Sequence, residues 1–220
     1  MASARGPGQA VFVYGSLMSP RVLRALLGAA APTAETGTFR PAWVAGFRRR
    51  AIRGRVYPAL ERVPGPGHAG AGAAAAALPE SLEPPRVPGV LLSGLSEDSL
   101  DKLDKFEDDD YERHVVPVYL GVPPAAASQE AAPAPHTDAF VYVWRESLRD
   151  LLAGEWSWAD QFLPVEDTYV ANCVRFAAAG YEWTFDIDDP RSRSASEASD
   201  ESVAPTADSG PAAATASSSS

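Results

Sequence analysis

The chain has 220 residues, of which 45% are hydrophobic and five are tryptophan, enough for a sizeable core within one domain. Its formal net charge is −10 without a basic stripe, which argues against a nucleic-acid partner. The single cysteine, Cys173, allows no internal disulfide, and the three histidines lack the spacing of zinc ligands. We therefore expect neither a metal nor an oxidising compartment.

The sequence also predicts no membrane segment. It has no uninterrupted apolar run of about 18 residues, and no apolar stretch precedes the first predicted strand. We expect a cytoplasmic protein with a flexible segment at residues 1–10. From Asp186 onward, seven acidic residues stand against two arginines and large apolar residues are almost absent, so residues 186–220 are expected to form a disordered, serine-rich acidic tail.

The first predicted elements are a strand, a turn and a helix. The β-branched and aromatic run Ala10–Tyr14 predicts a strand that stops at Gly15. A helix should follow, with Ser19 as its N-cap and Pro20 in its first turn. Its apolar face is formed by Val22, Leu23, Leu26 and Leu27.

Short antiparallel strands are expected between Trp43 and Leu60, followed by a Gly/Ala/Pro-rich surface insert at residues 63–86. A strand at Val87–Leu95 then leads into a helix capped at Ser96. This helix should end near the acidic cluster Asp108–Asp110.

The remaining part of the domain is predicted to contain two strands and one or two helices. The strands, at Tyr111–Leu120 and Ala139–Trp144, are separated by a second low-complexity insert at residues 121–138. Helices are expected from the segments SLRDLLAGEW and WADQFLPVEDTYVANCVRF. Residues 11–185 would then form one α+β domain.

Two features, the Gly-Ser turn and Glu107, contain chemical groups suited to a reactive site. The Gly-Ser turn between strand and helix points backbone N–H groups into one space, as in anion sites, although such a turn also serves as a plain connection. Glu107 follows the apolar Phe106 at a helix end, where burial and nearby Asp residues would raise its pKa. The alternative is a solvated surface glutamate.

Several other residues have two interpretations. Arginines at positions 48, 49, 50, 53 and 55 would attract a carboxylate or form a solvated face. Tyrosines at 57, 111 and 142 would line a pocket or belong to the core, and tryptophans 156 and 158 are interpreted as packing residues. Cys173 is expected to be buried, and neither His114 nor His136 makes a convincing partner for Ser16 as a nucleophile.

The motifs in order resemble the gamma-glutamylcyclotransferase-like family. They are VFVYGSLM, GRVYPAL, GVLLSGL, LDKLDKFEDDDYERHVVPV and FVYVW, and the tryptophan-rich GEWSWADQF is similar to the plant avirulence-induced (AIG2-like) branch. The resemblance covers most of residues 11–165. It implies a small, mostly antiparallel β-barrel with flanking helices.

The resemblance also implies a cofactor-free acyltransferase that cyclises a small γ-glutamyl substrate, releasing 5-oxoproline and an amine or amino acid. Glu107 would be the proton acceptor and donor. The substrate-binding loop would comprise Tyr14, Gly15, Ser16, Leu17, Met18 and Ser19. Two alternatives stay open: a catalytically silent ligand-binding or regulatory protein of the same fold, and an acyl-transfer enzyme that uses Ser16. The oligomeric state and the identity of the γ-glutamyl compound are not predicted.

Overall fold

The structure, a computed structural model, describes residues 9–63, 84–124 and 135–184. In chain order the strands are β1 (Gln9–Val13), β2 (Phe39–Ala45), β3 (Phe47–Ile52), β4 (Pro58–Arg62), β5 (Arg86–Leu95), β6 (Tyr111–Leu120), β7 (His136–Trp144) and β8 (Leu152–Glu155). The α-helices are α1 (Pro20–Leu27), α2 (Glu97–Glu107) and α3 (Glu166–Ala178). Short helical turns are η1 (Ser16–Met18), η2 (Gly28–Ala30), η3 (Asp108–Asp110), η4 (Glu146–Leu151), η5 (Trp158–Phe162) and η6 (Leu163–Val165).

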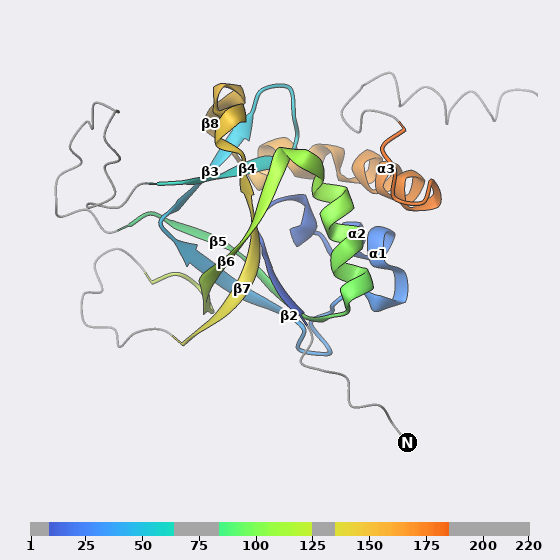
Figure 1. Ribbon diagram of the computed structural model, residues 1–220, viewed down its shortest axis with the longest axis horizontal. Coiled ribbons are helices and arrows are strands. Elements are labelled where there is room, and N and C mark those ends of the chain that lie inside the picture. The colour runs from blue at the N-terminus through green and yellow to red at the C-terminus, as the bar shows by residue number, and fades with distance from the viewer. Residues whose placement is uncertain (1–8, 64–83, 125–134, 185–220) are drawn as a thin grey trace, which may run out of the picture.

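Five strands close into a barrel in the order β1-β5-β2-β6-β7. All neighbours are antiparallel except β1 and β7, which pair in parallel through Val11 with Phe140 and Phe12 with Val141. A separate three-stranded sheet has the order β4-β3-β8 (Figure 1). The expected α+β class, a small and mostly antiparallel barrel with flanking helices, is confirmed.

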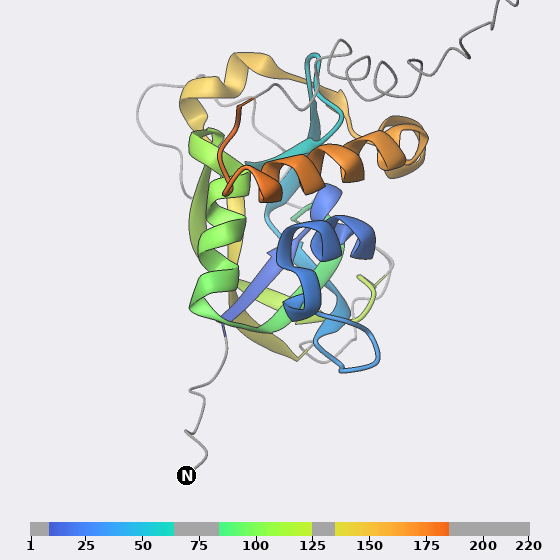
Figure 2. The ribbon, with the colours of Figure 1, turned by 90° about the vertical axis from the view of Figure 1, so that its right-hand side faces the viewer.

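Strand β1 is buried on both faces, which explains its uninterrupted apolar sequence. Successive side chains of a strand point to opposite faces, so Val11 and Val13 pack toward the helices while Phe12 and Tyr14 pack into the barrel interior. The helices α1, α2 and α3 lie together on one side of the barrel (Figure 2). The end of β1 is therefore enclosed between the barrel and this helical layer.

Both predicted helix caps are present. The Ser19 side chain accepts hydrogen bonds from the N–H groups of Arg21 and Val22 at the start of α1, and Ser96 accepts one from the Ser99 N–H at the start of α2. Helix α2 ends at Glu107 because the next residue, Asp108, leaves the helical conformation, with φ 56° and ψ −165°. The chain thereby turns from α2 into β6.

The second half of the chain differs from the sequence-based expectation in two places. Residues Leu152–Glu155, expected to be helical, form strand β8 and pair with β3. Strand β7 begins at His136, three residues before the expected Ala139, because His136 pairs with Tyr119 of β6. Most of both low-complexity inserts and all of the acidic tail lie outside the described residues.

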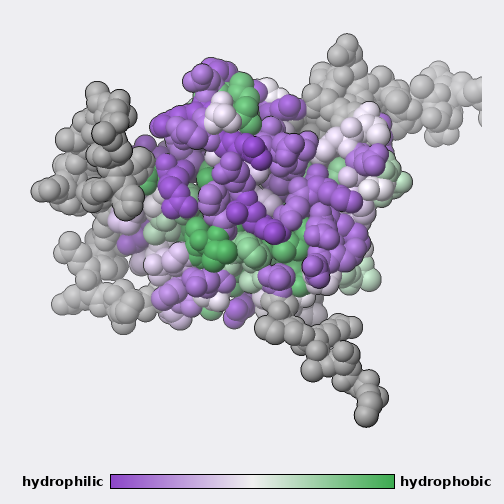
Figure 3. Space-filling model, in the orientation of Figure 1, coloured by the Kyte–Doolittle hydropathy of each residue, from purple (hydrophilic) through white to green (hydrophobic). Residues whose placement is uncertain are grey.

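The surface is largely hydrophilic on the face shown in Figure 3, where apolar side chains gather only in small separate patches. Cys173 and Trp156 are buried, as expected. No helix in the described part of the chain is long and apolar enough to cross a membrane.

Candidate active site

The candidate site forms where β1 ends and the chain turns into η1. Gly15 is required here by space, since a Cβ atom on it would lie 2.7 Å from Cδ and 2.8 Å from Cγ of Pro58. Real Cβ atoms do not approach other heavy atoms so closely. The loop can therefore pass beneath Pro58 only with glycine at this position.

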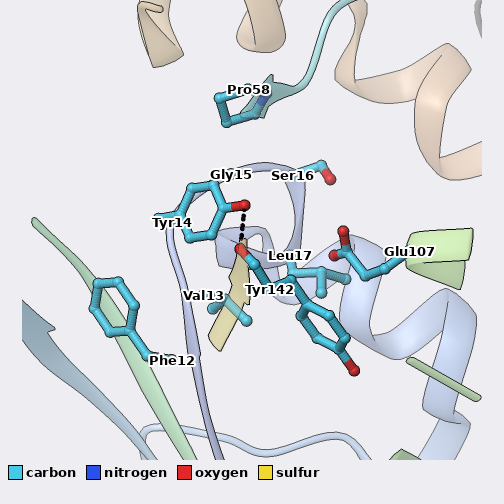
Figure 4. A pocket seen from close by; sticks show the side chains of 9 residues that line it. All are labelled: Phe12, Val13, Tyr14, Gly15, Ser16, Leu17, Pro58, Glu107 and Tyr142. Carbon is cyan, nitrogen blue, oxygen red and sulfur yellow. Dashed lines mark hydrogen bonds between the residues drawn. The ribbon is translucent and has the colours of Figure 1, made fainter. Parts of the chain in front are cut away.

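A narrow pocket opens beside this loop (Figure 4). Its cavity volume is about 20 Å³, space for roughly one water molecule. The pocket combines the loop with one carboxylate, one further tyrosine and an apolar wall. Its lining residues are Phe12, Val13, Tyr14, Gly15, Ser16, Leu17, Pro58, Glu107 and Tyr142.

Backbone N–H groups at the start of η1 are available to a ligand. Later in the turn, the N–H groups of Met18 and Ser19 donate to the carbonyls of Gly15 and Ser16 over 2.8 and 3.0 Å. The first N–H groups of a helical turn have no partner within it, and no backbone acceptor for those of Ser16 or Leu17 is found in the described residues. This end of the turn thus suits an anion.

Glu107 is held at the pocket by the last turn of α2. Its carboxyl group points toward the loop that carries Ser16 and Leu17 (Figure 4). Burial, and secondarily the negative charge of Asp104, raise the pKa of Glu107 from 4.5 to about 8. Within the described part of the chain, its carboxyl group has no ion pair or hydrogen bond. A carboxyl group of this pKa can both accept and donate a proton near neutral pH.

Two tyrosines connect the pocket to a charged pair outside it. The Tyr14 hydroxyl donates to the Tyr142 carbonyl over 2.7 Å, and the Tyr142 hydroxyl donates to Asp104 Oδ1 over 2.7 Å. Asp104 Oδ2 in turn accepts from Arg113 Nη1 at 2.5 Å. Burial is the main cause that raises the pKa of both tyrosines, so both keep their protons at neutral pH. These contacts fix the wall of the pocket around Glu107.

Helix α3 holds the loop from the opposite side. The Tyr169 hydroxyl donates to Ser16 Oγ over 3.2 Å, and the Ser19 hydroxyl donates to Glu166 Oε1 over 2.6 Å. The sequence analysis expected helices in this region but gave no role to Tyr169 or Glu166. No motif marks either residue, because the contacts join segments about 150 positions apart in the sequence.

The structure brings five of the seven predicted site residues together in the pocket: Tyr14, Gly15, Ser16, Leu17 and Glu107. Met18 and Ser19 lie beyond the lining, and the Ser19 side chain is engaged by the α1 cap and Glu166. Of the other tyrosines considered, Tyr142 lines the pocket. Tyr111 supports the pocket from behind, donating to the Pro58 carbonyl over 2.9 Å.

The geometry at Ser16 is not that of a catalytic triad. Its side-chain contact is with Tyr169, whereas His114 lies near Glu112 and His136 packs against Tyr119. No cluster of three or more potential metal ligands occurs among residues 9–63, 84–124 and 135–184. The chemical groups that face the pocket are thus one carboxyl group, tyrosines and backbone donors.

Comparison with known proteins shows the family to which the chain belongs. Residues 11–158, more than half of it, match the family described as gamma-glutamyl cyclotransferase, AIG2-like. The chain therefore belongs to this family, in its AIG2-like branch.

Two relatives come from Arabidopsis thaliana. AIG2-like protein D is 38% identical over 110 residues, which span 50% of this chain and 56% of that protein. AIG2-like protein C is 30% identical over 166 residues, 76% of each chain. The matched stretch thus falls short of two thirds of AIG2-like protein D.

Similar solved structures include the solution structure of an Arabidopsis thaliana protein, with a TM-score of 0.47 and 21% identity over 83% of this chain and 99% of that one. A yeast gamma-glutamyl cyclotransferase specific to glutathione has a TM-score of 0.41 and 16% identity, covering 75% of this chain and 78% of its own.

Proposed function

We propose that this protein is a cofactor-free gamma-glutamylcyclotransferase that converts a small γ-glutamyl compound into 5-oxoproline and a free amine or amino acid. One observation carries the proposal. Glu107, a carboxyl group with a pKa of about 8, shares a narrow pocket with unpaired backbone donors at the start of η1. Membership of the gamma-glutamyl cyclotransferase, AIG2-like family supports it.

In the proposed binding mode, the substrate α-carboxylate is held by the N–H groups of Ser16 and Leu17. A carboxylate is favoured there because the N-terminal end of a helical turn carries partial positive charge. The γ-carbonyl then lies toward Glu107. Binding has to widen the cavity, because a γ-glutamyl group is much larger than the single water molecule that about 20 Å³ admits.

The reaction needs a proton shuttle and no protein nucleophile. The substrate α-amine attacks its own γ-carbonyl carbon, forming the ring C–N bond while ionised Glu107 accepts the proton from the amine. The bond between that carbon and the leaving nitrogen then breaks, and Glu107 returns the proton to the departing amine. Because nucleophile and electrophile belong to one molecule, holding it in the cyclising conformation supplies much of the rate advantage. Ser16 is a binding residue in this scheme.

A second candidate, which membership of the same family equally allows, is a catalytically silent ligand-binding or regulatory protein of the same fold. It would bind a γ-glutamyl compound without turnover. Assaying 5-oxoproline release from γ-glutamyl dipeptides, γ-glutamylamines and glutathione separates the two. Release from any of them supports the cyclotransferase. Binding of a panel member by the folded protein, with no release from any, supports the silent protein.

A further inference from the structure

A second, larger hollow lies next to the candidate active site, in a part of the molecule that the proposed reaction does not use. It has a volume of about 630 Å³ and lies between β3, the start of β5 and the end of β8. We call it the arginine groove, because Arg48, Arg49, Arg50 and Arg86 line it. The sequence analysis left open whether the arginines of β3 attract a carboxylate or form a solvated face.

The groove carries excess positive charge. Arg50 is paired with Glu61 at 3.0 Å, a carboxylate that it shares with Arg149, and also donates to the Ala153 carbonyl. Arg50 is therefore already engaged by protein partners. Arg48 and Arg49 have no acidic partner among the described residues. Glu155 is the one acidic side chain among the described lining residues, and Arg48 and Arg49 outnumber it. A negatively charged ligand would therefore be attracted to this groove.

Among the arginines of the groove, Arg49 differs most from a solvated surface residue. Its guanidinium lies 5.0 Å from the ring centroid of Trp156, which is itself buried. Burial lowers the pKa of Arg49, although an arginine keeps its charge at neutral pH. Placing a charged group in a partly desolvated position is unfavourable unless an opposite charge is supplied.

Arg49 also joins the groove to the candidate active site. Its Nη1 donates to the Tyr14 carbonyl over 3.0 Å, and Tyr14 lines the catalytic pocket. The Tyr14 backbone thus contacts Arg49 of the groove and leads into the Gly15 turn of the pocket. On the groove side, Trp156 is fixed by a 2.8 Å hydrogen bond from Nε1 to the Val56 carbonyl. The Tyr14 backbone is therefore the common boundary of the pocket and the groove.

We propose that the arginine groove binds the leaving-group half of the γ-glutamyl substrate and selects leaving groups that carry a carboxylate over neutral amines. This inference rests on the proposed function. Arg48 and Arg49 would supply the charge, and Trp156, which lies beneath the Arg49 guanidinium, would hold that group in position. A guanidinium can donate two parallel hydrogen bonds to the two oxygens of a carboxylate, whereas a neutral amide offers one acceptor oxygen and no charge.

The test compares two ligands that differ only at that carboxylate: γ-glutamylalanine and γ-glutamylalaninamide. Their affinities are measured by calorimetry on the Glu107→Gln protein, in which turnover is not expected to interfere. We expect the acid to bind about tenfold more tightly than the amide, the range of one charge-assisted hydrogen bond. Arg48→Met and Arg49→Met, each added to Glu107→Gln, should weaken binding of the acid and leave binding of the amide nearly unchanged.

Controls separate charge recognition from folding. Arg24→Met removes an exposed arginine of α1 that is not among the groove's lining residues, and it should retain the full preference for the acid. Arg49→Lys keeps a charge and a donor for the Tyr14 carbonyl and should restore part of the preference. Arg48 is exposed and supports no described hydrogen bond, so its variant tests the groove even if Arg49→Met unfolds.

Equal affinities for the two ligands, or a preference that survives in both arginine variants, would overturn the inference, as would failure of both ligands to bind. Failure of the proposed function shows in a different readout. If wild-type protein releases no 5-oxoproline from any member of the γ-glutamyl panel but prefers the acid in an arginine-dependent manner, the groove assignment holds and the cyclotransferase assignment falls.

Discussion

The Tyr169 hydroxyl donates a hydrogen bond to Ser16 Oγ over 3.2 Å, linking helix α3 to the loop of the candidate active site. Both residues are buried. The family match ends at residue 158, so this support comes from a helix beyond the matched segment. Tyr169 is therefore a positioning residue for the loop in the proposed reaction.

Replacing Tyr169 with phenylalanine should lower the free energy of unfolding by about 1 kcal/mol, because it leaves the Ser16 hydroxyl without its tyrosine partner. We also expect KM for a γ-glutamyl substrate to rise more than kcat falls, since the loop binds the ground state. Tyr181→Phe is the matched control: its hydroxyl donates to the Leu26 carbonyl at 2.7 Å, away from the loop. Urea unfolding and steady-state kinetics check both variants. A KM change of the same size in the control would contradict the positioning role.

The raised pKa of Glu107 predicts a loss of stability as pH rises. Between pH 4.5, its ordinary pKa, and about 8, the unfolded chain ionises this residue while the folded protein keeps it neutral. The stability associated with neutral Glu107 is therefore fully present below this range. Across the range the free energy of unfolding falls by roughly 2 to 4 kcal/mol. Urea unfolding of wild type and Glu107→Gln from pH 5 to 8.5 measures this, and the variant should lose less stability. Identical slopes would contradict the raised pKa.

Removing the charge of Asp104 should shift the pH profile of kcat/KM in the proposed reaction. Its negative charge is the second cause that raises the pKa of Glu107, after burial. Asp104→Asn keeps an oxygen to accept from Tyr142 but removes the charge. We expect the rise of kcat/KM with pH to shift to lower pH in this variant. Asp101→Asn, on an exposed position of the same helix, should leave the profile in place. A shift of equal size in Asp101→Asn would argue against local tuning by Asp104.

The close approach of Gly15 to Pro58 predicts a specific steric effect. In Gly15→Ala the new methyl group would collide with the proline ring, and we expect a loss of about 1 to 3 kcal/mol together with reduced ligand binding. Gly154→Ala meets no atom within 4 Å and should stay within about 0.5 kcal/mol of wild type. Combining Gly15→Ala with Pro58→Ala should recover part of the loss. Full additivity of the two substitutions would show that they do not interact.

The features predicted correctly from the sequence are those set by local chemistry. Ser19 and Pro20 mark the start of α1, and Ser96 and the positions of Leu100, Leu103 and Phe106 define α2. The placement of Glu107 at a helix end followed from the same local signals, whereas its meeting with the Gly-Ser turn was implied only by the family resemblance. These depend on capping and periodicity, which act over a few residues.

Features that depend on distant contacts were not predictable in the same way. Strand β8 exists because Leu152 and Glu155 pair with β3, a partner about 100 positions earlier in the chain. The hydrogen bond between Tyr169 and Ser16 and the contact of Pro58 with Gly15 likewise join separate segments. A single sequence carries propensities but not the tertiary partners that override them.

The most direct test of the proposed function is 5-oxoproline release by wild-type and Glu107→Gln protein, with Asp101→Asn as the matched charge control on α2. Removing a proton shuttle typically costs a factor of about 100 to 10,000. We predict release by wild type and Asp101→Asn, and a loss of at least about hundredfold in Glu107→Gln with its fold intact. Undiminished release by Glu107→Gln would contradict the role of Glu107.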